Sequence, residues 1–325
     1  MIKYIVSRLL QGLVTVILSV IILFFIINLA PGDPIIFIVG GGEPPPPEIV
    51  EMLRAEYGLD RPVHERLVIY TSKLLRFDLG YSFIYKVSVF DLVVGRLKAT
   101  VVLAMLSYVI STLLGVLLAI VAVRRPGFLI DKLINGLSTV FFSLPSFWVG
   151  QILILVFAVR LGLLPTGGLV DPRTPPETIP RLLDVLRHTI LPLITLTLVY
   201  LGLMTRLSRS LLIETLQEDF ITTARAKGLN ENLVISKHAL RVAMLPIITM
   251  ANFNLAFLLS GSILVETVFS WPGVGTLLYD SILKRDYPVM AGIFYMTILL
   301  SVIINLITDL IYLALDPRVK LGERR

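Results

Sequence analysis

The sequence predicts an all-α membrane protein with six transmembrane helices. Of its 325 residues, 56% are hydrophobic and only 16% are charged, and the mean hydropathy is +0.86. That composition is too apolar for an ordinary soluble domain. The chain also contains six runs without Asp, Glu, Lys or Arg that are long enough to cross a bilayer. The lipid bilayer is therefore expected to surround much of this chain.

Each of the six runs is expected to form a helix, because a chain in lipid must satisfy its backbone hydrogen bonds internally and the alternation typical of barrel strands is absent. A crossing of about 30 Å of hydrocarbon takes about 20 residues at helical rise. The predicted spans are residues 9–30, 99–123, 133–159, 189–205, 242–265 and 287–308. The fourth, at about 17 residues, lies at the lower limit for a crossing.

The first run also has features of a signal peptide, since Lys3 and Arg8 precede it and Ala30 ends it. Its apolar region of about 22 residues exceeds the about 7 to 15 that are usual in signal peptides. We therefore expect a retained first helix.

Six spans place both termini on the same side of the membrane, and the positive residues indicate which side. With the amino terminus inside, the cytoplasmic segments carry fifteen Lys and Arg, against six outside when the long first outer loop is left out. An excess of positive residues marks the cytoplasmic side. Both termini are therefore predicted to be cytoplasmic.

The first outer segment, residues 31–98, is rich in proline and glycine, and loops of this length are usually functional or locally folded. Pro47 is suited to start a helix and Gly58 to end one, and Ile49 and Met52 fall on one face between them. We expect a short amphipathic helix here, which either packs on the protein's own outer surface or binds a partner.

Two shorter outer loops, residues 160–187 and 266–286, carry further turn signals. Trp271 is expected to anchor at the membrane interface. Glu266 and Asp309 lie near span ends, where hydration lowers the cost of a charge. Glu266 is also placed to meet a solute that enters from outside.

The loop between the fourth and fifth spans, residues 206–241, is predicted to form two short helices below the membrane. Asp219 is expected to cap the first helix, Arg225 and Lys227 lie in its last turn, and Gly228 ends it. Asn230 is expected to cap the second helix. A DNA-binding helix pair has a similar pattern, but here both helices are tied closely to membrane spans and are not free to enter a groove.

Polar side chains inside apolar spans are candidates for a solute pathway, because each costs free energy unless it faces a cavity or a neighbouring helix. Together with Glu266, the candidates are Gln151, Asn252, Asn254 and Asn305. Neutral amides also form hydrogen bonds between helices, so each of them has that alternative role.

Several kinds of chemistry are not expected. The chain has no cysteine and three histidines, at loops or span edges, so neither a metal site nor a catalytic nucleophile with its base is predicted. The net charge of +6 follows membrane topology rather than nucleic-acid binding. No Gly-x-x-x-x-Gly-Lys-Ser/Thr phosphate-binding loop occurs, so the chain is not expected to hydrolyse ATP.

Ordered motifs along nearly the whole chain resemble the integral-membrane permeases of ATP-binding-cassette (ABC) importers, and within them the dipeptide and oligopeptide class. The motifs are residues 30–34 (APGDP), 57–62 (YGLDRP), 78–80 (DLG), 223–229 (TARAKGL), 238–241 (HALR), 265–273 (VETVFSWPG) and 315–318 (LDPR). Two departures from the general family signature occur: Thr222 and Thr223 stand where it has Glu and Ala, and the gap from Gly228 to Pro246 is longer than in sugar-type permeases. The longer gap is similar to the peptide class.

This resemblance implies a type I importer permease fold in the plasma membrane. It implies a first helix at residues 1–30, an extracytoplasmic region at 31–98, a permease core at 99–314 and a cytoplasmic tail at 315–325. The loop that couples the permease to its ATPase would contain Asp219, Thr222, Thr223, Ala224, Arg225, Ala226, Lys227, Gly228 and Leu229.

The resemblance also implies partners. These are a second homologous permease subunit, two ATPase subunits that bind ATP and Mg, and an extracytoplasmic substrate-binding protein. The chain itself would hold no cofactor and would not be an enzyme. Oligopeptides or dipeptides are the expected solutes, with oligosaccharides or nickel complexes as alternatives.

A proton-coupled secondary transporter is the rival from a different class. It would usually place Asp, Glu or His near the middle of the membrane, and the six spans contain none there.

Overall fold

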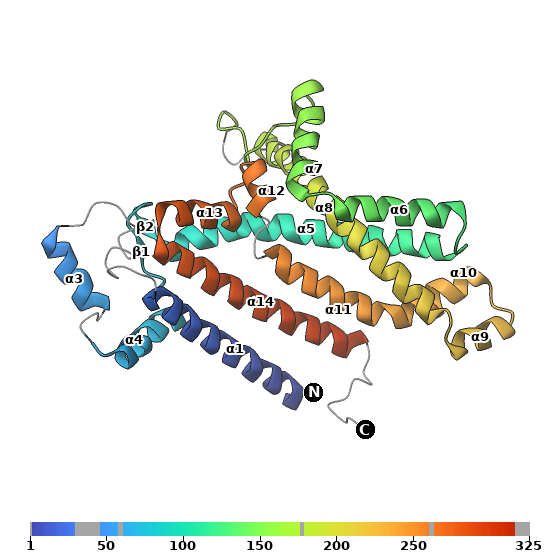
Figure 1. Cartoon of the computed structure of the whole chain (residues 1–325), viewed down its shortest axis with the longest axis horizontal. Coiled ribbons are helices and arrows are strands. Elements are labelled where there is room, and N and C mark those ends of the chain that lie inside the picture. Colours follow the sequence, from blue (N-terminus) through green and yellow to red (C-terminus); the bar gives the residue numbers. More distant parts are fainter. Residues whose placement is uncertain (1, 30–45, 58–60, 176–178, 260–262, 316–325) are drawn as a thin grey trace.

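The computed structural model describes residues 2–29, 46–57, 61–175, 179–259 and 263–315. Helices dominate it (Figure 1). The long helices are α1 (Ile2–Leu29), α5 (Val89–Val123), α6 (Leu129–Ser143), α8 (Ile179–Thr215), α11 (Leu240–Leu259) and α14 (Tyr287–Leu315). The shorter elements are α3 (Pro47–Tyr57), α4 (Val63–Leu75), α7 (Ser146–Leu153), the π-helical η1 (Ile154–Arg160) and η2 (Val234–Ala239), α9 (Asp219–Ala226), α10 (Glu231–Leu233), α12 (Ile263–Val268) and α13 (Val274–Lys284).

The all-α membrane fold is confirmed. Within the described residues, five helices are long and apolar enough to cross a membrane, and a sixth crossing results if the bent pair of α6 with α7–η1 counts as one. The six crossings correspond to the six apolar runs of the sequence. The expected outer helix between Pro47 and Gly58 is also present as α3.

The third span is not one helix, as its apolar run had suggested. It is broken between Ser143 and Ser146 and bends there by 98°. Pro145 explains the break, because the residue before a proline is pushed out of the α-helical region. Leu144 indeed has an extended backbone, with φ −75° and ψ 133°. In Figure 1, α7 consequently points away from the row of long helices.

Two helices are much longer than their apolar runs. α5 begins at Val89, ten residues before its predicted span, and α8 has 37 residues where the run has about 17. Polar residues at the ends of these helices continue the helix beyond the apolar region. Helix length in this fold therefore exceeds what hydropathy alone indicates.

Close helix packing depends on glycine at two crossings. A Cβ added to Gly115 on α5 would lie 2.8 Å from the Cβ of Met204 on α8. A Cβ added to Gly202 on α8 would lie 2.5 Å from the carbonyl oxygen of Ser138 on α6. Small residues let membrane helices approach to backbone contact. α8 thereby packs against α5 on one side and α6 on another.

The elements α3, α4 and a short antiparallel hairpin, β1 (Tyr81–Ser82) with β2 (Val87–Ser88), lie at the end of the molecule opposite α9 (Figure 1). Ser82 donates a 2.6 Å hydrogen bond to Asp286, whose carboxylate also accepts from the Val289 amide at the start of α14. This contact ties the hairpin to the last span.

Trp271 is buried inside the protein, so the expectation of an exposed interfacial anchor is wrong. Its side chain is only 1% exposed, and its indole Nε1 donates to the Ala99 carbonyl at 3.2 Å. The segment after α12 folds back on α5, which encloses the ring. Trp271 is a core residue.

Candidate functional site

Residues 216–239 form a projecting unit that links the end of α8 to the start of α11. It contains α9, α10 and η2, and it lies at one extreme end of the molecule (Figure 1). Ile221 and Ala224 are the buried residues of α9, and they pack in one cluster with Val234 and Ile235 of η2 and Leu212 of α8. The orientation of α9 is therefore fixed relative to both long helices.

The turns of the projecting unit follow the sequence pattern with one correction. Glu218, not Asp219, is the N-cap of α9; Asp219 is the first helical residue, where its charge still complements the helix macrodipole. Asn230 caps α10 as expected, its side chain accepting from the Asn232 amide at 2.9 Å. Gly228 has φ +76°, the left-handed conformation expected of the residue that ends a helix.

An ion pair closes the projecting unit on its exposed side. Arg225 of α9 donates from Nη2 to Glu231 at 2.6 Å and from Nε at 3.1 Å. Bidentate pairs of this kind fix geometry as well as charge. The hydrogen-bonded Glu231 carboxylate raises the pKa of the Arg225 guanidinium above its ordinary value.

The predicted coupling residues divide into an exposed and a buried set. Ala224 is buried and holds the helix in place, and Leu229 is half-buried. The exposed members are Asp219, Thr222, Thr223, Arg225, Ala226, Lys227 and Gly228.

Phe220 joins the exposed set, although the apolar pattern alone does not distinguish it. Its side chain is 40% exposed in the first turn of α9. A large aromatic that remains exposed on a helix outside the membrane is suited to contact another protein. Phe220 differs from the other apolar residues of the sequence in its position next to Asp219 at the start of α9.

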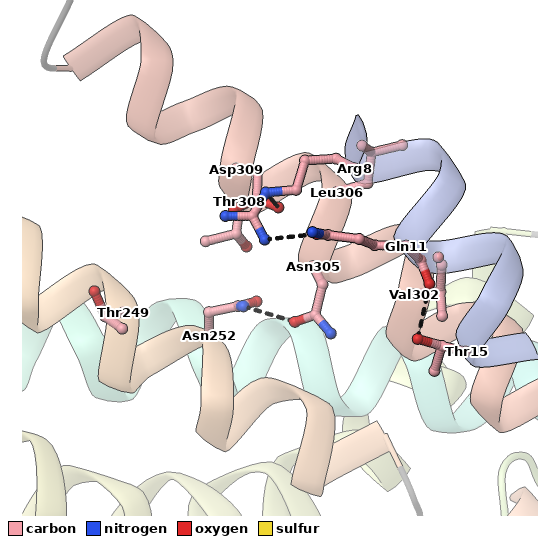
Figure 2. A pocket seen from close by; sticks show the side chains of 11 residues that line it. Arg8, Gln11, Thr15, Thr249, Asn252, Val302, Asn305, Leu306, Thr308 and Asp309 are labelled. Atoms are coloured by element: carbon pink, nitrogen blue, oxygen red, sulfur yellow. Dashed lines mark hydrogen bonds and ion pairs between the residues drawn. The ribbon is translucent and has the colours of Figure 1, made fainter. Parts of the chain in front are cut away.

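A second feature is a polar cavity of about 310 Å³ between α1, α11 and α14. Figure 2 shows polar side chains from all three helices directed into it. Its polar lining residues are Arg8, Gln11 and Thr15 of α1, Thr249 and Asn252 of α11, and Asn305, Thr308 and Asp309 of α14.

Two pairs of side chains cross this cavity between helices. The Asn252 Nδ2 donates to Asn305 Oδ1 at 3.1 Å, which joins α11 to α14. Arg8 Nε lies 3.1 Å from Asp309 Oδ2, which joins α1 to α14, and Arg8 also donates to Gln11 at 3.2 Å. Within the described part of the chain, Asn252 Oδ1 is buried and has no hydrogen-bond donor.

The structure thus brings together two of the five predicted pathway residues, Asn252 and Asn305. Gln151 is exposed on α7 and does not line this cavity. Asn254 belongs to α11, but its side chain lies outside the described residues. Arg8 and Asp309 come together although they are 301 positions apart in the sequence. The signal for this pair is that opposite charges flank the first and last apolar runs on the same side.

Glu266 is not hydrated at a span end, and that expectation is wrong. It is 1% exposed, accepts from Thr100 Oγ1 at 2.8 Å and from the Thr276 amide at 3.0 Å, and packs directly against Gly273 and Gly275. The Thr100 hydroxyl in turn accepts from the Val274 amide at 2.9 Å. The carboxylate is the centre of a network that joins α5, α12 and α13.

A second buried carboxylate stabilises the packing of α6 against α8. Asp131 of α6 is 3% exposed and pairs with Arg209 of α8 through two bonds of 2.6 and 2.8 Å, while the Gly127 amide donates to it at 2.7 Å. The pair fixes the turn between α5 and α6 against α8. No group of three or more potential metal ligands occurs among the described residues.

Comparison with known families gives a match over almost the full chain. Residues 111–321 match the family described as binding-protein-dependent transport system inner membrane component, and residues 1–104 match the N-terminal region of such membrane components.

Individual relatives have the same length as this chain. A protein of Brucella suis biovar 1 named as a candidate peptide permease is 36% identical over 98% of this chain and 99% of its own. The glutathione transport system permease protein GsiC of Escherichia coli K12 is 35% identical over the same shares.

Solved structures show the same fold. The MetNI methionine ABC transporter, in inward facing conformations, contains a chain that matches with a TM-score of 0.55 and 19% identity, over 69% of this chain and 96% of that one. A second crystal form of that transporter gives a TM-score of 0.56 at 18% identity. A likeness at this level of identity supports the type I importer permease fold.

Members of the matched family are permease components, without a cofactor of their own, and their ATPase is a separate subunit. The five apolar crossings of the described residues, or six with the bent pair, agree with a multi-pass protein of the inner membrane. The chain therefore belongs to the binding-protein-dependent transport system inner membrane components, and it is the permease subunit, not an enzyme, of an ABC importer.

Proposed function

We propose that this chain forms half of the translocation pathway of an importer for oligopeptides or dipeptides. The names of the relatives in Brucella suis and Escherichia coli, a peptide permease and a permease for the tripeptide-like solute glutathione, support this substrate class. Oligosaccharides and nickel complexes are the alternative solutes that the test below distinguishes.

The proposed assembly contains a second homologous permease, two ATPase subunits that bind ATP and Mg, and an extracytoplasmic substrate-binding protein. Both termini are proposed to be cytoplasmic. The positive residues support that orientation. The ion pair between Arg8 and Asp309, which joins the start of α1 to the end of α14, supports termini on one side. The projecting unit would then lie in the cytoplasm as well, because α11 follows it directly and meets both helices at the polar cavity.

The proposed mechanism rests on the packing of α9 against the membrane helices that flank it. Its buried residues Ile221 and Ala224 pack against the end of α8 and the start of η2–α11, so α9 cannot shift without moving two membrane helices. A partner that binds the exposed face of α9 would therefore move the spans. ATP-driven closure of the ATPases would shift α9, and the bundle would change between two arrangements.

The exposed residues around α9 are the proposed contacts to an ATPase. Phe220 supplies an apolar anchor, while Asp219, Thr222, Thr223 and Ala226 surround it. Asn252 and Asn305 are proposed to line the pathway at the polar cavity; Gln151, Asn254 and Glu266 stay predictions.

The test of the assembly and its substrate is ATP hydrolysis by the complex in lipid nanodiscs, with its binding protein loaded in turn with short peptides, oligosaccharides or a nickel chelate. We expect stimulation by peptides. Stimulation by another solute instead would overturn the substrate class. A chain that purifies alone and transports a solute without ATP would be a secondary transporter.

The test of the coupling contact is Phe220→Ala, which removes the exposed aromatic without disturbing the buried side of α9. We expect the peptide-stimulated ATPase rate and uptake to fall together, because loss of an aromatic anchor weakens docking by about 2 kcal/mol or more. Val68→Ala on α4 is the control, since Val68 is 65% exposed at the opposite end. If both variants behave like the unmodified protein, α9 is not the docking helix.

A further inference from the structure

The polar cavity is lined by a pair of charged side chains at one depth and by two amide side chains at another. Arg8 immediately precedes the first apolar run and Asp309 immediately follows the last, so the charged pair lies at the edge of the membrane region. Asn305 lies one helical turn further in on α14, where Asn252 of α11 donates to it (Figure 2). A solute in this cavity would meet charges at its mouth and amides inside.

We propose that this cavity is a binding subsite for a zwitterionic dipeptide, with Arg8 and Asp309 recognising its two terminal charges and Asn252 and Asn305 its backbone amide. The proposal rests on the proposed function, and it assigns to that function a position between α1, α11 and α14.

The chemistry of the lining fits such a solute. A guanidinium is the preferred partner of a carboxylate, and a carboxylate pairs with an ammonium. Arg8 and Asp309 pair with each other at 3.1 Å, so a dipeptide, which carries both terminal charges on one small molecule, can exchange one charge with each residue. A solute with a single charge would pair with one residue and leave the other without its ion partner, which is costly away from bulk water.

The inner amides fit a peptide bond. Asn252 uses its Nδ2 to reach Asn305, and its buried Oδ1 has no donor among the described residues. A peptide N–H supplies the missing donor, because buried acceptors are normally paired. A cavity of about 310 Å³ is at the small end of ligand sites, which matches a dipeptide rather than a long chain.

A lipid headgroup is the competing occupant, and two observations disfavour it. Basic pockets select anionic headgroups, whereas the charged residues of this lining are one Arg and one Asp. One wall is α11, which continues directly from the projecting unit, so movement of that unit would change the shape of the cavity. A site whose shape follows the ATPase cycle is suited to a transported solute.

The experiment uses one peptide in three forms: free, N-acetylated with only the carboxylate charge, and C-amidated with only the ammonium charge. Uptake of each is measured with the nanodisc complex and its binding protein for the unmodified chain, Asp309→Asn and Arg8→Gln. Because the binding protein is the same in every sample, its own preference cancels in the ratio of variant to unmodified protein.

We expect opposite shifts from the two variants. Asp309→Asn removes the carboxylate that faces the Arg8 guanidinium and should raise uptake of the acetylated peptide relative to the amidated one. Arg8→Gln should do the reverse, each by about tenfold, as interactions between unit charges at about 4 Å near a protein surface allow. The double variant should lose both preferences. Arg61→Gln, which removes an exposed ion pair to Glu65 at the outer side, is the control and should leave all ratios unchanged.

A second measurement does not depend on the charge variants folding. The chain has no cysteine, so Thr15→Cys places a single thiol in the lining of the cavity. Free peptide at saturating concentration should slow its alkylation, and the doubly capped peptide should not.

The outcomes separate the two proposals. Equal charge ratios in all variants, with alkylation that responds to phospholipid composition and not to peptide, would overturn the subsite and identify a lipid site, while peptide-stimulated ATPase would still support the proposed function. No stimulation of the unmodified complex by any peptide would instead remove the substrate class, and the subsite with it.

Discussion

At the scale of single residues, two buried threonine hydroxyls on α5 differ in whether they have a hydrogen-bond partner. The Thr100 hydroxyl donates to Glu266 and accepts from the Val274 amide, so it satisfies two other elements at once. Thr112 lies three turns further along α5, and its buried Oγ1 has no partner among the described residues. These two threonines test what a buried hydroxyl contributes.

Thr100→Val should destabilise the protein by about 1 to 3 kcal/mol, because it leaves the Val274 amide and one Glu266 oxygen buried without a partner. Thr112→Val, the control, should be neutral or slightly stabilising, since it replaces an unpaired hydroxyl by a methyl group of the same shape. Thermal unfolding of the two variants in nanodiscs measures the difference. Equal losses would show that the Glu266 network is not what holds α12 and α13 on α5.

At the scale of secondary-structure elements, the projecting unit depends on one exposed ion pair for the angle between its two short helices. The pair of Arg225 and Glu231 is nearly half exposed on both sides, so its contribution to overall stability is about 0 to 1 kcal/mol. Its bidentate geometry nevertheless holds α9 against α10. The pair is therefore expected to matter for coupling more than for folding.

Arg225→Glu and Glu231→Arg should each lower the number of solute molecules transported per ATP while changing the melting temperature little, because like charges would push α9 away from α10. The double variant Arg225→Glu with Glu231→Arg should recover most of the coupling, since the exchanged charges attract again. Uptake and ATP hydrolysis measured on the same nanodisc sample give the ratio. Failure of the exchange to restore it would mean that Arg225 contacts the ATPase directly instead.

At the scale of the whole molecule, α8 is the central helix, and its contact with α6 allows no side chain at Gly202. A Cβ there would lie 2.5 Å from the Ser138 oxygen and 2.8 Å from the Phe142 nitrogen, both backbone atoms that cannot rotate away.

Gly202→Ala should therefore force α6 and α8 apart and cost about 1 to 3 kcal/mol. Gly136→Ala on α6 is the control, because a Cβ there meets nothing within 4 Å and alanine favours a helix by about 0.5 to 1 kcal/mol. The melting temperature of the assembled complex and the yield of complex on size exclusion compare the two. A stable Gly202→Ala complex would mean that the helices are not packed to backbone contact in the assembly.

Much of this architecture is predictable from the sequence, because apolar runs and turn residues act locally. The six runs, the outer helix α3 and the turns at Gly228 and Asn230 follow from such patterns. The 98° bend at Pro145 does not follow from hydropathy, which reports how apolar a run is and not its direction.

The parts of the site that could not be predicted depend on long-range packing. Asn252 and Asn305 are recognisable as polar residues in apolar spans, but their meeting across a cavity with Arg8 and Asp309 requires the arrangement of three helices. Glu266 and Trp271 lie in a run whose pattern predicts an outer loop, and their burial follows from the folding of this segment back onto α5. The coupling contacts and the orientation in the membrane stay predictions.

The part of α8 that follows Pro192 also determines how far its ends move when the helix rotates. Beyond Pro192, residues 193–215 run without another proline for about 34 Å at helical rise. If a helix of this length rotates by about 5° about one end, its other end moves by about 3 Å, which is roughly the width of a water molecule. If an ATPase docks at the projecting unit as proposed, a displacement of a few ångströms there corresponds to a rotation of this helix by only about 5°.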